Sequence, residues 1–148
     1  MEGPTNRLLI VGGALSGVAA LAHLACLVVG APLFRLLGAG EQMAQLHAGG
    51  SWYPKLVTLA IATALATWAA YALSAAGVFR PFPLRRTVLA AVTGVYIVRG
   101  VALVPVIAYF HGNSPTFWVV SSATCLAIGL VHFVGLRQSW GRLRRLAA

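Results

Sequence analysis

The chain has 148 residues, of which 59% are hydrophobic and only 9% are charged, and its mean hydropathy is +0.85. Soluble domains carry about 25% charged residues, so this composition excludes a soluble fold and predicts an integral membrane protein with a single domain over residues 1–148. The formal net charge of +9 comes from arginines beside apolar runs, where topology and anionic headgroups favour them, so we expect a lipid bilayer as partner and no nucleic acid.

Four apolar runs predict an all-α, antiparallel bundle of four transmembrane helices at about residues 8–31, 55–78, 87–110 and 116–137, followed by a basic tail at 138–148. The first run exceeds the apolar core of a secretory signal, so we expect a retained helix. Small residues should line the core of the bundle, because they let helices approach closely. These are Gly13, Gly17, Ala62, Ala66, Ala70 and Gly94.

The connection between the first two spans predicts a short amphipathic helix from Glu41 to His47, which Gly49 and Gly50 should end. Ser51 is a plausible cap for the helix that follows. The two cysteines, Cys26 and Cys125, lie inside apolar runs, so we expect buried thiols rather than a disulfide.

Basic residues predict the orientation of the four spans, because positively charged loops stay on the cytoplasmic side. One side holds eight of them and the other side holds Arg35 and Lys55. Both termini should therefore be cytoplasmic, in a cytoplasmic (inner) membrane that we expect to be bacterial because arginine far outnumbers lysine. The eight are Arg7, Arg80, Arg85, Arg86, Arg137, Arg142, Arg144 and Arg145.

Arg99 lies near the middle of the third predicted span, where an arginine costs about 2.5–3.5 kcal/mol on insertion scales. It should face a protein interior, either as a structural arginine bonded to carbonyls and hydroxyls or as an anchor for a ligand. Tyr96 lies three residues away on the same helix, and Trp68 and Tyr71 should lie at a similar depth. We predict a ligand site formed by Arg99, Tyr96, Trp68, Tyr71, His23 and Glu41.

Two members of this predicted site have open alternatives. Glu41 is either a solvated residue at the start of its short helix or an acid that folds back towards Arg99. His23 either shares a cavity with Arg99 or bonds a neighbouring carbonyl. A haem between His23 and His132 is disfavoured, because the two histidines should differ in height by about 15 Å at 1.5 Å per residue.

The leading functional hypothesis is binding or transport of a lipophilic, anionic or carbonyl-bearing small molecule or lipid around Arg99, with a homodimer as a reasonable assembly. An alternative is an accessory or assembly subunit of a larger membrane complex, for which Ala66→Leu should disrupt association. A third is a lipid-modifying enzyme with His23 or His47 as base. No catalytic set, metal site or cofactor is predicted, because the chain has two acids and no nucleotide or zinc motif.

Overall fold

The computed structural model of the chain describes residues 5–102 and 113–145. Within these ranges the chain is helical and contains no strand. The helices are α1 (Arg7–Val29), α2 (Ala31–Leu36), α3 (Glu41–Ala48), α4 (Trp52–Ala76), α5 (Arg85–Val101) and α7 (Pro115–Arg145).

Three of these helices, α1, α4 and α7, are long and apolar enough to cross a membrane. This agrees with a helical membrane protein. The described part of α5 has 17 residues and carries arginines in its first turn, and it is not among the three. Residues 103–110 of the third predicted span, Pro105 among them, lie outside the described residues.

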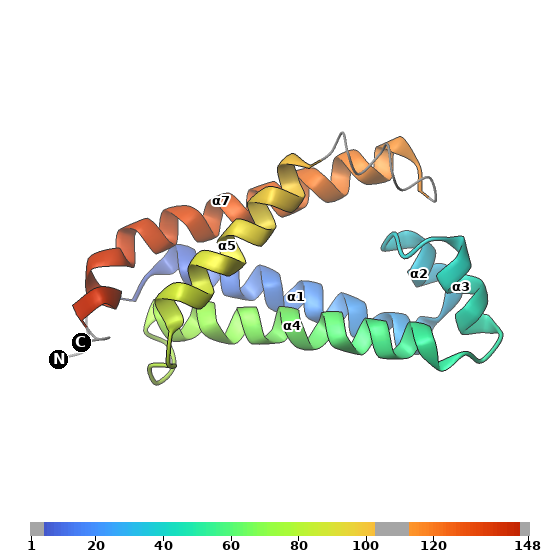
Figure 1. Cartoon of the computed structure of the whole chain (residues 1–148), viewed down its shortest axis with the longest axis horizontal. Helices are drawn as coiled ribbons and strands as arrows, with labels where there is room; N and C mark the ends of the chain where they lie inside the picture. Colours follow the sequence, from blue (N-terminus) through green and yellow to red (C-terminus); the bar gives the residue numbers. More distant parts are fainter. Residues whose placement is uncertain (1–4, 103–112, 146–148) are drawn as a thin grey trace.

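The long helices form two pairs, α1 with α4 and α5 with α7 (Figure 1). Within each pair the helices run in opposite directions, and α1 also packs against α7. The start of α1, the end of α4, the start of α5 and the end of α7 lie together, and we call this the basic end. Helices α2 and α3 lie at the other end, which we call the α2–α3 end.

Hydrogen bonds from Asn6 hold the basic end together. Its side-chain oxygen accepts from the Leu9 backbone N–H at 3.0 Å and so caps α1. Its amide nitrogen donates to the Gly135 carbonyl at 3.2 Å and to Ser139 Oγ at 3.0 Å, while its backbone N–H donates to the Ala76 carbonyl. One residue therefore connects α1, α4 and α7.

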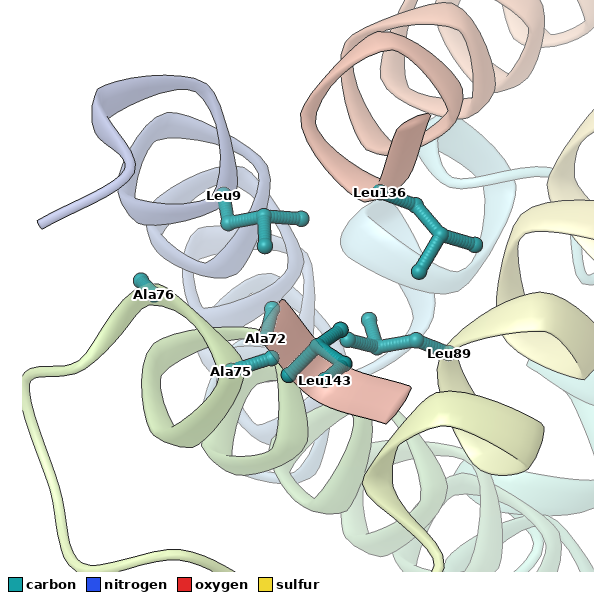
Figure 2. Packing of buried hydrophobic residues seen from close by; sticks show 7 residues of the cluster. All are labelled: Leu9, Ala72, Ala75, Ala76, Leu89, Leu136 and Leu143. Carbon is teal, nitrogen blue, oxygen red and sulfur yellow. The ribbon is translucent and has the colours of Figure 1, made fainter. Parts of the chain in front are cut away.

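A buried apolar cluster lies beside Asn6 and contains residues from all four long helices (Figure 2). Because lipid tails are as apolar as leucine, close van der Waals packing rather than exclusion of water favours such a cluster inside a membrane. The cluster comprises Leu9, Ala72, Ala75, Ala76, Leu89, Leu136 and Leu143.

Leu143 corrects the predicted boundary of the last helix. We expected the span to end at 137 and a basic tail to follow, but α7 continues to Arg145 and Leu143 is 1% exposed. Leu136, Ser139 and Leu143 follow one another at helical spacing and all are buried. The segment is therefore part of the core, and Arg142 donates to the Ala75 carbonyl at 3.3 Å.

The predicted small-residue face of α4 is also partly wrong. Ala62 is buried, but Ala66 is exposed and Ala70 is only half-buried. A strict four-residue spacing drifts around a helix of 3.6 residues per turn, whereas a buried face alternates spacings of three and four. Five buried apolar positions follow that alternation, namely Ala62, Leu65, Ala69, Ala72 and Ala76, and Ala75 is buried beside them.

The predicted close approach at Gly13 is confirmed, since a Cβ there would lie 3.0 Å from Leu73 and 3.2 Å from the Ala69 carbonyl of α4. Gly17 has more room, with Ala69 Cβ at 4.0 Å. Gly94 does not line the core, because no atom lies within 4 Å of the Cβ position there.

The connection between α1 and α4 contains one helix more than predicted. α3 and its end at Gly49 agree with the sequence, and Ser51 Oγ accepts from the Tyr53 N–H at 3.3 Å. The addition is α2, which begins after Gly30 at φ 79° and has Pro32 in its first turn. Proline at this position ends the preceding helix yet suits the start of a new one.

Candidate functional site

Arg99 lies in the last described turn of α5 and is half-buried. Its Nη1 donates to Ser122 Oγ and its Nη2 donates to Ser121 Oγ, both at 3.0 Å, and its guanidinium lies 5.4 Å from the centre of the Trp118 ring. The three partners are on α7. Ser121 and Ser122 follow Pro115 by about 10 Å of helix, so the side chain extends from α5 towards the α2–α3 end.

These partners are uncharged, which leaves the positive charge of Arg99 without a counter-charge among the described residues. The sequence contains two acids, Glu2 and Glu41. Glu2 lies outside the described residues. The hydroxyl groups accept hydrogen bonds from the guanidinium and do not neutralise it.

Glu41 pairs with Arg35, so it does not fold back to Arg99. Arg35 Nε and Nη2 donate to the two carboxylate oxygens at 2.6 and 2.8 Å, and Gln45 donates to Oε1 at 3.1 Å. These hydrogen bonds, that from Arg35 first, lower the pKa of Glu41 to about 2. Both side chains are about half exposed, so the pair joins α2 to α3 at the surface.

Tyr96 and Trp68 contact each other, but away from the Arg99 guanidinium. Their ring centres lie 5.3 Å apart in an edge-on arrangement, and the Tyr96 hydroxyl shares a 2.9 Å hydrogen bond with Ser16 Oγ of α1. Positions 96 and 99 differ by about 60° around a helix. Tyr96 therefore fills the interface with α1 and α4, while Arg99 points along α7.

Tyr71 lies apart from this group, with its ring 5.3 Å from that of Phe82 in the turn between α4 and α5. That turn is also held by Ser74, whose hydroxyl donates to the Arg80 carbonyl at 2.9 Å. The structure thus places Tyr71 at the basic end rather than beside Arg99.

His23 lines a small cavity of about 170 Å³ at the α2–α3 end, together with Cys26, Phe34, Met43 and Thr58. Arg99 does not line this cavity. The Nδ1 atom of His23 lies 2.8 Å from the Ala19 carbonyl. Of the two alternatives for His23, the structure therefore shows the one in which it bonds a neighbouring carbonyl.

His132 lies far from His23, in agreement with the predicted difference in height of about 15 Å between the two histidines. It is fully buried against Gly12, where a Cβ would come within 2.7 Å of its ring, and its ring stacks on Tyr96 at 5.5 Å. Gly12 is eleven residues from His23 on α1, or about 16 Å. Both cysteines are free thiols; Cys26 is buried as predicted, whereas Cys125 is only half-buried. No three-residue metal cluster is found within the described ranges.

Sequence reasoning missed the partners of Arg99, which are Trp118, Ser121 and Ser122. Two adjacent serines in an otherwise apolar run were a visible indication, since a hydroxyl in a membrane span needs a partner. Comparison with models of protein families, with curated proteins and with solved structures found no match. The site must therefore be interpreted from its own geometry.

Proposed function

We propose that the chain is a four-span protein of a cytoplasmic membrane, with both termini cytoplasmic, that binds or transports a lipophilic anion whose charged group lies at Arg99. In this proposal α5 belongs to the third span, and the sequence remains apolar to residue 110. The proposal rests chiefly on one observation: Arg99 has no counter-charge within residues 5–102 and 113–145.

The energetic argument compares an arginine with and without a counter-ion. A cation at membrane depth costs about 2.5–3.5 kcal/mol on insertion scales. Hydrogen bonds between charged and neutral groups contribute about 1.5–3 kcal/mol each, so Ser121 and Ser122 can offset the cost of burial. They also fix the guanidinium in place, and a carboxylate or phosphate arriving there would find a preorganised cation beside an aromatic ring.

The first experiment is a thermal-shift screen of detergent-purified wild type with fatty acids and with their uncharged methyl esters. A ligand at one hundred times its dissociation constant stabilises the folded state by about 2.7 kcal/mol. We expect acids to raise the melting temperature and esters of the same chain length to have little effect, because only the acid supplies a charge to Arg99.

Two variants locate the response. Arg99→Gln should lose the stabilisation by acids, and Arg80→Gln, which removes an exposed arginine at the basic end, should keep it. Equal stabilisation by acids and esters in wild type, or an unchanged response in Arg99→Gln, contradicts the proposal. The comparison of acid with ester remains decisive even if Arg99→Gln does not fold.

A second candidate function is that of an accessory subunit in a larger membrane complex. It is favoured by the outward face of α4, which exposes Thr63, Ala66 and Thr67 instead of burying them. Small residues at a lipid-facing position allow another helix to approach closely. Because Ala66 is exposed, Ala66→Leu should leave folding intact and reduce recovery of a partner in crosslinking experiments.

A further inference from the structure

A groove of about 600 Å³ lies between α5 and α7, on the side towards the basic end. Its walls are apolar side chains together with one hydroxyl and one cation. The residues that matter here are Thr93, Gly94, Ile97, Phe133, Arg137 and Trp140.

The groove forms because the two helices touch closely at one place and separate beyond it. A Cβ at Gly100 would lie 2.7 Å from Leu126, and one at Gly129 would lie 2.9 Å from Ile97, so the backbones nearly meet there. Towards the basic end the large, exposed side chains of Phe133 and Trp140 line the groove. At Gly94 the floor is open, with no atom within 4 Å of the Cβ position.

Cationic groups surround the basic-end mouth of the groove. Arg137 lines it and is exposed. The guanidinium of Arg86 stacks on the Trp140 ring, with Cζ 3.8 Å from its centre. Tryptophan is typical of the membrane interface, where the headgroup phosphates lie. From Trp140 at the interface, the groove follows α7 back to Phe133, which is about 10 Å of helix deeper in the bilayer.

We infer that this groove binds one acyl chain of an anionic phospholipid, whose phosphate lies at Arg137 and Arg86. Positive charge at the mouth complements the headgroup, and the open position at Gly94 accommodates the chain. This site is separate from Arg99, which lies on the other side of the close contact at Gly100, and it does not depend on the proposed function.

A second copy of the chain fits this face less well. In a two-fold dimer the same surface meets itself, so two copies of Arg137 and Arg86 would approach each other within the membrane interface. Like charges brought together in this way oppose association. A lipid brings the opposite charge to the same place.

The test measures lipid retention by native mass spectrometry after incubation with phosphatidylglycerol or with phosphatidylcholine of the same acyl chains. Wild type should retain phosphatidylglycerol preferentially. Arg137→Gln should reduce that preference about fivefold, the effect of one basic residue near an anionic surface, while Arg80→Gln should leave it unchanged. Gly94→Leu fills open space, so the protein should fold and retain less of both lipids.

Three results would overturn the inference. The first is equal retention of the two lipids by wild type, with no loss in Gly94→Leu. The second is displacement of phosphatidylglycerol by inorganic phosphate, which would indicate a site for a soluble anion. The third is a wild-type dimer that Gly94→Leu converts to monomer, which would assign the groove to a second copy of the chain.

Discussion

Gly12→Ala should destabilise the protein, although alanine is the better helix former. A Cβ at position 12 would lie 2.7 Å from Cε1 and 2.8 Å from Nδ1 of His132. The ring has no room to move away, because His132 is fully buried, its Nδ1 lies 2.9 Å from the Ile128 carbonyl, and its other face stacks on Tyr96. The contact can therefore be relieved only by separating α1 from α7.

The expected magnitude follows from two opposing effects. Replacing glycine by alanine within a helix gains about 0.5–1 kcal/mol. Overpacking a filled interior costs about 1–3 kcal/mol. We expect a net loss of about 1 kcal/mol for Gly12→Ala, within a range of about 0–2.5 kcal/mol. The matched control is Gly94→Ala, which adds the same methyl group where no atom lies within 4 Å and should be neutral or slightly stabilising.

The assay is equilibrium unfolding in detergent, followed by circular dichroism, for both variants and for Gly12→Ala in a His132→Ala background. Removing the ring should remove the penalty, so that Gly12→Ala in that background behaves like Gly94→Ala. A penalty of the same size with and without the ring would refute the reasoning. So would a Gly12→Ala variant more stable than Gly94→Ala.

Two further predictions concern the two ends of the molecule. Asn6→Ala should lower the free energy of unfolding by about 2–3 kcal/mol, because it removes the cap of α1 and the amide hydrogen bonds to α7. Asn6→Asp should lower it less, because aspartate keeps the capping oxygen. Equal free energies of unfolding for the two variants would contradict this. The pKa of Glu41 is lowered from 4.5 to about 2, so the stabilisation of the α2–α3 contact is present above pH 4.5 and is lost as the pH falls towards 2. Carboxyl NMR titration should place Glu41 near 2 in wild type and nearer 4.5 in Arg35→Gln, and a wild-type value near 4.5 would contradict the bidentate pair.

Apolar length predicted most of the long helices, because a membrane span is set by bilayer thickness rather than by tertiary contacts. The sequence also identified Glu41–His47 as a helix and Ser51 as a cap, since both depend on local chemistry. It failed at Pro32, where the same residue can end one helix or begin another. It failed again at Leu143, where the arginines of the predicted tail concealed an apolar face that packs inside.

The candidate site was predicted less well, because its geometry depends on side-chain direction. Arg99 was recognised from its depth alone. The sequence could not show whether its long side chain would lie beside Tyr96 or extend along α7 to Ser121 and Ser122. Trp68 was expected only at a depth similar to that of Tyr96, and the contact between the two rings depends on side-chain direction that the sequence does not give. Glu41 forms its ion pair with Arg35, six residues away in the sequence, and not with the more distant Arg99.

The hydrogen bonds of Asn6 have a mechanical consequence. They join the two helix pairs at the basic end, and the Ser16–Tyr96 bond lies only nine residues into α1. At the α2–α3 end, Asn113 Nδ2 donates a hydrogen bond of 2.9 Å to the Gly38 carbonyl and so connects the two pairs there as well. The two pairs are therefore joined at both ends, because Phe117 also packs against Gly38 at the α2–α3 end. Arg99, Ser121 and Ser122 all belong to the α5–α7 pair, so any separation of the two pairs would move these three residues together.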